Sequence, residues 1–138
     1  MAYEIPDEMM QTRIELSKRY LHGKGIEIGA LHLPLPVEEN TIVRYVDRYE
    51  KDGLLKHYPE LKGYPLVDID VCDNGEQLKK IKNNKLDFII ASHFLEHCSD
   101  FIGTITNHLK KLKNGGILFY IIPNMRNCFD RDRSPTSF

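Results

Sequence analysis

The sequence has no long hydrophobic run, no excess of either charge and no basic stripe. No segment approaches the length of a membrane-spanning helix, and the acidic amino terminus with Pro6 differs from the basic start and apolar run of a signal peptide. Nineteen Lys and Arg residues against twenty Asp and Glu residues give a net charge of -1. A phosphate backbone or an anionic membrane would need a positive surface. We therefore expect a cytoplasmic protein that binds neither nucleic acid nor membrane.

The sequence also lacks paired cysteines. Cys72, Cys98 and Cys128 are odd in number, far apart and without a Cys-x-x-Cys pair. This pattern argues against a disulfide framework and against a thiolate zinc site, so we expect reduced thiols that are buried or without function. With 138 residues, 41% hydrophobic and 28% charged, the chain has the composition of one globular domain with a single core.

The spacing of apolar residues predicts strands that alternate with helices. Strands are expected at residues 26–29, 41–46, 64–69, 86–91 and 117–122. Helices are expected within residues 1–23, 50–61, 74–82 and 101–112. The connection after the first strand is predicted to be mostly loop, because Pro34 and Pro36 forbid a regular helix there.

This alternation predicts an α/β, Rossmann-like, doubly wound fold in three layers. We expect five mainly parallel strands in the order 3-2-1-4-5, with ligands at their carboxyl edge. The domain would comprise a leading helix at residues 1–23, a core at residues 24–123 and a tail at residues 124–138. In the last helix, the residues expected to form the apolar face are Phe101, Ile102, Ile105, Leu109 and Leu112.

The first predicted strand carries the candidate binding residues around which the chain is organised. It ends at Gly29, with Glu27 two positions earlier. A glycine at a strand end lets the backbone approach a ligand, and a carboxylate beside it can accept hydrogen bonds from an amine or a hydroxyl. Asp47 ends the second strand, 18 residues after Gly29. A carboxylate about 20 residues beyond the glycine turn is placed to bind ribose hydroxyls.

Acids and glycines recur in a fixed order at the ends of the predicted strands. These motifs are Glu27-Ile-Gly29, Asp47, Asp70, the stretch from Asp87 through Ser92-His93 to Glu96-His97, and Asn114-Gly115-Gly116. In this order they resemble the motifs of class I S-adenosylmethionine-dependent methyltransferases, in particular small-molecule enzymes of the type 11-like group. The resemblance covers residues 20–123. Residues 25–36, 43–48 and 129–136 are also similar to a bacterial subgroup associated with surface-polysaccharide biosynthesis.

The resemblance implies S-adenosylmethionine as the cofactor and a small-molecule or sugar acceptor. Glu27 would lie near the amino group of the methionine part, Asp47 would bind the ribose hydroxyls, and Asp70 would hold the adenine. The full set of cofactor-binding residues that it implies is Glu27, Gly29, Ala30, Asp47, Arg48, Asp70, Val71, Ser92 and His93. For a hydroxyl or amine acceptor, a base must take a proton, and His97 is the candidate. The alternative is that His97 caps or packs the following helix.

Two other activities share parts of this pattern. His93-Phe-Leu-Glu96-His97 fits the His-x-x-Glu-His pattern of some zinc peptidases. We expect no metal, because His93 directly follows a buried strand rather than lying within a helix. A nicotinamide-dependent oxidoreductase is disfavoured, because the third glycine of the Gly-x-Gly-x-x-Gly turn and the helix behind it are absent.

The chain departs from the resembled family at two places. Gly29 is followed by Ala30-Leu31-His32 rather than by a second glycine. The chain also stops fifteen residues after Pro123, which leaves no room for two further strands that would form an antiparallel hairpin. We therefore expect a truncated or reduced domain whose fifth strand is an exposed edge, able to pair in a homo-oligomer. A non-catalytic binding or structural module is the alternative function.

Overall fold

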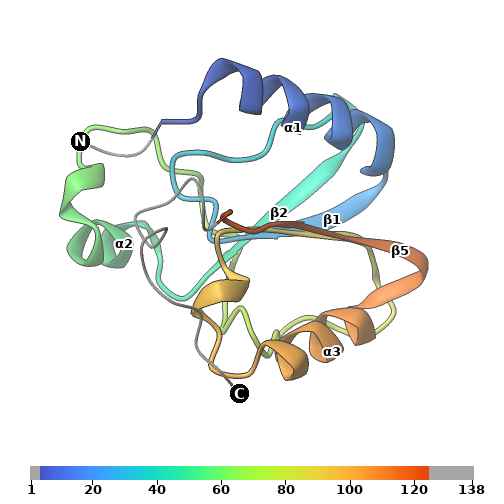
Figure 1. The fold of residues 1–138 in the computed structure, drawn as a ribbon. Helices are drawn as coiled ribbons and strands as arrows, with labels where there is room; N and C mark the ends of the chain where they lie inside the picture. The colour runs from blue at the N-terminus through green and yellow to red at the C-terminus, as the bar shows by residue number, and fades with distance from the viewer. Residues whose placement is uncertain (1–3, 125–138) are drawn as a thin grey trace.

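The computed structural model describes residues 4–124 as a parallel sheet with helices on both faces (Figure 1). Its strands are β1 (Lys24–Ile28), β2 (Ile42–Asp47), β3 (Val71–Cys72), β4 (Leu86–Ser92) and β5 (Leu112–Ile121). They lie in the order β3-β2-β1-β4-β5, and every neighbouring pair is parallel. The predicted fold class and strand order are confirmed. Of the expected tail, only Asn124 is described, and Cys128 also lies outside the described residues.

Two longer helices flank the sheet. α1 (Asp7–Tyr20) covers one face, and α3 (Phe101–Lys111) covers the other (Figure 1). Asp100 caps α3, because its Oδ1 accepts the backbone N–H of Gly103 at 2.8 Å. The remaining elements are α2 (Lys51–His57) and the 3₁₀ turns η1 (Pro59–Leu61) and η2 (Leu95–His97). Within residues 4–124, no helix has the length and apolar character needed to cross a bilayer.

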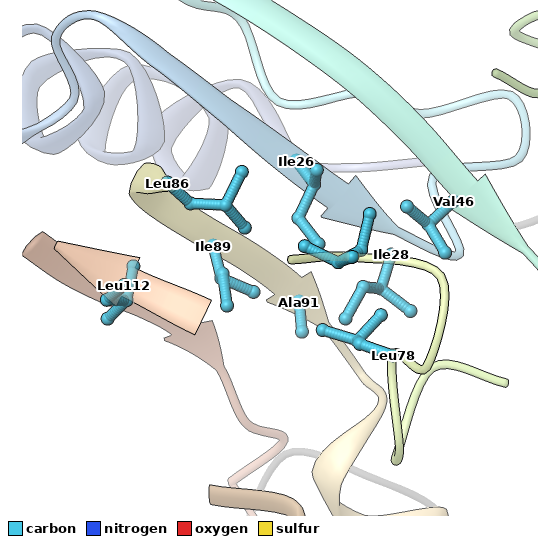
Figure 2. Packing of buried hydrophobic residues seen from close by; sticks show 9 residues of the cluster. Ile26, Ile28, Val46, Leu78, Leu86, Ile89, Ala91 and Leu112 are labelled. Atoms are coloured by element: carbon cyan, nitrogen blue, oxygen red, sulfur yellow. The ribbon is translucent and has the colours of Figure 1, made fainter. Parts of the chain in front are cut away.

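The core is centred on β1 and β4, which are buried on both faces. On the α3 side, Ile28 and Ala91 lie next to Leu78, as Figure 2 shows. On the α1 side, Phe88 and Ile90 pack with side chains of the flanking segments, Leu21 and Leu35. The residues of the α3-side cluster are Ile26, Ile28, Val46, Leu78, Ile81, Leu86, Ile89, Ala91 and Leu112. This double burial fixes the central strands, and with them the residues at their carboxyl ends.

The predicted third strand is wrong in position. Residues 64–69 form no strand, and β3 comprises only Val71 and Cys72. The Asp70 carboxylate accepts the backbone N–H of Tyr45 at 2.8 Å, where a neighbouring strand would offer a carbonyl. The backbone N–H of Val67 donates instead to Leu31, in the loop after β1 (3.0 Å). The backbone N–H of Asp70 still donates to the carbonyl of Tyr45 at 2.9 Å, but before Asp70 side-chain and loop hydrogen bonds replace the strand ladder.

The helix predicted at residues 74–82 is also wrong, because this segment consists of turns. The Asp73 carboxylate accepts the backbone N–H groups of Asn74 and Lys80, each at 2.7 Å. Leu78 has a φ of 49°, a left-handed conformation that interrupts any helix. The segment still supplies core residues, since Leu78 is fully buried.

The apolar face predicted for the last helix is only partly the face that it buries, because Leu112 is 6% exposed and Ile105 is half-buried. α3 buries Thr104 and His108, whereas Ile102 and Leu109 are 66% and 55% exposed. α1 likewise buries Arg13 and Ser17, and its Met9, Leu16 and Tyr20 are exposed. Both helices thus turn polar side chains inward and leave an apolar stripe uncovered by residues 4–124.

Candidate functional site

Three strand ends stand level at the carboxyl edge of the sheet. Ile28 pairs with Val46 on one side and with Ala91 on the other. The residues that follow these three are Gly29, Asp47 and Ser92, so they form a row along the edge. The structure therefore brings together three of the predicted cofactor-binding residues, each from a different strand.

Gly29 opens a tight turn at the centre of this row. Its φ is 66°, and a Cβ added at this position would meet no atom within 4 Å. Its N–H continues the β1–β2 ladder by donating to the carbonyl of Val46 at 3.0 Å. Leu31 also has a positive φ of 54°, and the N–H of Leu33 donates to the carbonyl of Ala30 at 3.0 Å. The chain thus turns away from the edge and leaves open space over Gly29.

Glu27 lies within β1, two residues before Gly29, and is almost fully buried. It is 1% exposed, and both of its carboxylate oxygens lie 3.1 Å from the backbone nitrogen of Leu35, which donates to them. Burial raises the pKa of Glu27 to about 7, although the hydrogen bond from Leu35 and the positive charge of Arg13 lower it. A cation bound beside Glu27 would favour its ionised form.

Arg13 is a candidate binding residue near Glu27 that the sequence did not reveal. It is 8% exposed, and its Nη2 is buried without a hydrogen-bond partner among the described residues. A buried guanidinium with an unused donor is suited to an anion such as a carboxylate. The only sequence signal was a charged residue within the apolar spacing of the first helix, and such a residue is normally solvent-exposed.

Asp47 holds the second strand end in place. Its Oδ1 accepts the backbone N–H of Arg48 at 2.7 Å, and its carbonyl accepts the N–H of Asp73 at 3.0 Å. Burial raises the pKa of the Asp47 carboxyl, whereas the N–H and the charge of Arg48 lower it. The other carboxylate oxygen, Oδ2, takes no part in this bond with Arg48. The carboxylate can therefore still accept a hydrogen bond at the carboxyl edge of the sheet.

The acid that follows the third strand is Asp73 rather than Asp70. Because β3 is Val71–Cys72, Asp70 precedes it, and its carboxylate is bonded to Tyr45 within the sheet. Cys72 pairs with Asp47, so Asp73 stands at the same edge, one position further along. Val71 packs against the α3-side core and is half-buried. Asp73 is not evident from the sequence, because the apolar residues at 64–69 place the strand too early.

Ser92 and His93 lie where β4 ends. Ser92 pairs with Ile121, and the N–H of His93 donates to the carbonyl of Ile121 at 2.8 Å. His93 adopts a φ of 51°, which turns the chain into η2. His97 lies in η2 with its side chain 77% exposed, and its Nε2 is 3.8 Å from the Glu96 carboxylate. His97 is thus open to solvent on the segment that leaves the candidate site.

The geometry of this segment differs from that of a zinc peptidase helix. His93 follows the strand and His97 lies in a 3₁₀ turn, so the two histidines do not share one face of an α-helix. Nδ1 of His93 is 3.6 Å from the carboxylate of Glu96. Over residues 4–124, no group of three or more His, Cys, Asp or Glu side chains is arranged to hold a metal ion.

A buried histidine of α3 links the loop after β3 to β5. His108 of α3 is fully buried, with Nε2 2.7 Å from the carbonyl of Gly75 and Nδ1 2.6 Å from the hydroxyl of Tyr120. A carbonyl can only accept, so Nε2 donates to Gly75 and the Tyr120 hydroxyl donates to Nδ1. Burial lowers the pKa of His108, which favours this neutral ring. The network fastens the loop after β3 against β5.

Two hollows lie beside the sheet. One, of about 300 Å³, is at the amino edge of the sheet and is lined in part by Arg19, Asp87 and Gly115. The other, of about 410 Å³, runs between α1 and β5, from Tyr20 to Arg13. Its lining is mostly apolar.

Comparisons with known proteins identify the fold. No family model matches the chain, and no curated protein matches it in sequence. A SAM-dependent methyltransferase from Aquifex aeolicus aligns with a TM-score of 0.61 at 16% identity, over 91% of this chain and 68% of that protein. A SAM-dependent methyltransferase from Thermotoga maritima aligns with a TM-score of 0.54 at 18% identity, over 89% of this chain and 58% of that protein.

A third structure of this kind contains a ligand. The trans-methyltransferase CalH, in complex with SAH, aligns with a TM-score of 0.51 at 18% identity, over 82% of this chain and 35% of that protein. The chain therefore spans about two thirds of the Aquifex protein and less of the other two. At these identities, the likenesses show the fold, which is that of class I methyltransferases.

Proposed function

We propose that the chain is an S-adenosylmethionine-dependent methyltransferase domain that acts on a small-molecule or sugar acceptor in the cytoplasm. The observation that carries this proposal is the row of Gly29, Asp47 and Ser92 at the carboxyl edge, with Glu27 behind it. It stands on a sheet whose fold is shared with SAM-dependent methyltransferases. The acceptor subgroup linked to surface polysaccharides rests on sequence resemblance alone.

Each part of the cofactor has a chemically suitable partner in this row. Asp47 accepts hydrogen bonds from the ribose hydroxyls, with Arg48 beside it. The open space over Gly29 and Ala30 admits the methionine part, whose ammonium lies towards Glu27 and whose carboxylate lies towards Arg13. Val71 and Asp73 line the adenine side, and this assignment replaces Asp70, whose carboxylate is bonded to Tyr45. Ser92 and His93 lie next to Gly29 along this edge, at the end of β4.

When bound, the cofactor supplies an activated methyl group, so the protein has to position the acceptor and receive its proton. His97 is the candidate base, because its imidazole is exposed on the segment that leaves the site and lies near the Glu96 carboxylate. With an acceptor in hand, we expect His97→Gln to lower kcat about 100-fold at unchanged cofactor affinity. His57→Gln, at another exposed histidine, serves as the matched control. A loss of less than about threefold in His97→Gln would exclude the base role.

The test of the cofactor assignment is calorimetric titration of the chain with S-adenosylmethionine and, separately, with S-adenosylhomocysteine. We expect saturable binding that Asp47→Ala abolishes. Asp68→Ala is the matched control, because this carboxylate is 95% exposed and its ion pair with Lys51 lies at the surface. Failure of the folded chain to bind either compound would refute the proposal. Binding of a nicotinamide dinucleotide in their place would indicate an oxidoreductase.

A non-catalytic module is the second candidate function, and the burial of Glu27 favours it. The loop at Leu35 already satisfies this carboxylate, so an entering ammonium has to compete with a backbone N–H. A chain that binds the cofactor but transfers no methyl group to any of a panel of sugar nucleotides and small alcohols or amines would support this alternative. Methyl transfer to one of them would exclude it.

A further inference from the structure

Gly75 is the point at which three segments of the carboxyl edge meet. It lies in the loop after β3 (residues 73–82), two positions after Asp73. A Cβ added at Gly75 would stand 2.7 Å from Cγ2 of Ile28, the last residue of β1, and 2.8 Å from Cζ of Phe94, which follows β4. A residue larger than glycine would have to move one of these two side chains. The loop after β3 therefore contacts both the end of β1 and the segment after β4.

His108 of α3 anchors Gly75. Its Nε2–H donates to the carbonyl of Gly75 over 2.7 Å, and its Nδ1 accepts the hydroxyl of Tyr120 over 2.6 Å. Burial raises the pKa of Tyr120 to about 12, so this hydroxyl keeps its proton and remains a donor. The hydroxyl of Tyr120 thus selects the tautomer of His108 that carries its proton on Nε2, which is the tautomer that can bind Gly75.

The same ring packs against the segment after β4 (residues 93–98). The rings of His108 and Phe94 lie 19° from parallel, with their centroids 6.4 Å apart. Phe94 also begins the turn that carries the candidate base, because its carbonyl accepts the N–H of His97 at 3.0 Å. One imidazole therefore contacts both the loop that carries Asp73 and the segment that carries His97.

Two further side chains of α3 bind the loop after β3. Asn107 and Lys111 donate to the carbonyls of Glu76 and Ile81, at 3.2 and 2.8 Å. Both hydrogen bonds remain when His108 is replaced, so the loop as a whole should stay on α3. Replacement of His108 should therefore release the first turn of the loop rather than unfold the domain.

We propose that His108 is a positioning residue of the candidate site, which holds the loop after β3 and the segment after β4 in one arrangement at the end of β1. This assignment rests on the proposed function, because the cofactor would lie across this edge, with its adenine beside Asp73 and the acceptor near His97. His108 is fully buried, so it acts on the cofactor through these two segments. Segments that are already in place before binding lose less freedom when the cofactor enters, which strengthens its binding.

Amide hydrogen exchange of the free chain, followed by NMR, tests this role without the cofactor. The amides to follow are hydrogen-bonded within the two segments, and they are those of Leu78, Lys80, His97 and Cys98. The reference is the amide of Gly29, which belongs to the β1–β2 ladder. We expect His108→Leu to accelerate exchange at all four amides about tenfold more than at Gly29, because the two segments open locally.

Two variants complete the exchange experiment. Leu21→Ala is the control for lost stability, because Leu21 is fully buried on the α1 side of the sheet and its truncation should accelerate all amides alike. Gly75→Ala keeps every polar group of the network but displaces Ile28 or Phe94, so it should accelerate the same four amides as His108→Leu. The proposal would be overturned if His108→Leu gave the uniform pattern of Leu21→Ala. It would also be overturned if the amides after β4 kept their wild-type rates in both loop variants.

Calorimetric titration with S-adenosylhomocysteine separates this role from the proposed function. We expect His108→Leu to weaken binding about tenfold, as for a site that is in place about a tenth of the time. His108→Gln should stay within about threefold of the wild-type affinity, because its amide nitrogen can replace Nε2 as the donor to Gly75. Unchanged affinity in His108→Leu would overturn the positioning role. A wild-type chain that binds no cofactor but shows the expected exchange pattern would refute the proposed function and still support the role of His108 in holding the two segments.

Discussion

Replacement of Glu27 by glutamine tests whether burial raises the pKa of this carboxyl group as far as its surroundings indicate. Burial raises the pKa of Glu27 from 4.5 to about 7 in the folded chain. The folded state therefore binds more protons than the unfolded state between these pH values, and stability falls as the pH rises through this range. A difference of about 2.5 pH units corresponds to about 3 kcal/mol of unfolding free energy. The amide introduced by Glu27→Gln would keep an oxygen for the N–H of Leu35 but would not titrate.

The measurement is urea unfolding followed by circular dichroism at pH 5, 6, 7 and 8. Between pH 5 and pH 8 we expect the free energy of unfolding of the wild-type chain to fall by about 2.5 kcal/mol relative to that of Glu27→Gln. The wild-type chain is the reference because His108 also titrates. Its lowered pKa makes the free energy of unfolding rise with pH below about pH 6.5, in both the wild-type chain and the variant. Glu39→Gln, at an exposed residue of the loop before β2, should keep the wild-type slope.

Two results would refute this reasoning. One is an unchanged pH slope in Glu27→Gln. The other is a carboxyl carbon titration of Glu27, followed by NMR, with its midpoint near the ordinary value of 4.5. If the proposed contact with the cofactor ammonium also holds, binding ionises Glu27 and releases up to about one proton near pH 6, which titrations in buffers of different ionisation enthalpy would detect.

Three further substitutions test the backbone and the buried network by urea unfolding. Gly29→Ala should cost about 1–2 kcal/mol from its positive φ alone, because its Cβ would meet no neighbour, and a neutral effect would contradict the turn geometry. Gly25→Ala should cost more, about 3 kcal/mol, because its Cβ would overlap the ring and carbonyl of Phe88; a smaller loss than for Gly29→Ala would exclude this packing. His108→Asn should cost about 2–4 kcal/mol, since it unpairs a buried hydroxyl and a buried carbonyl, with the exposed His22→Asn as a control that should change little.

The sheet was predictable because its signals are local and strong. The run at residues 86–91 is apolar enough to require burial on both faces, and glycine or acidic residues mark the ends of β1 and β2. β3 was not predictable in position. Its two residues are held partly by the Asp70 carboxylate bonding to Tyr45, and such a contact between residues 25 positions apart leaves no periodic signal.

The site was predictable to the extent that it follows from strand ends. Gly29, Asp47 and Ser92 were placed correctly at the edge because parallel strands bring their carboxyl ends together. Arg13 and Asp73 were missed because their positions depend on helix packing and on the true end of β3. Burial of a charged side chain is unusual enough that sequence patterns assign it to the surface.

The buried polar faces of the helices have one physical cause. The connections after β1 and β3 are loops, and loops near the core present carbonyls that need donors. Ser17 of α1 donates to the carbonyl of Pro36 at 2.6 Å. On α3, His108 and Lys111 donate to Gly75 and Ile81 at 2.7 and 2.8 Å. Helices that satisfy loop carbonyls must turn donors inward, and their apolar side chains are then left on the flank. On the α1 side this flank adjoins β5, where Leu16 and Tyr20 line a hollow together with Phe119 and Ile121.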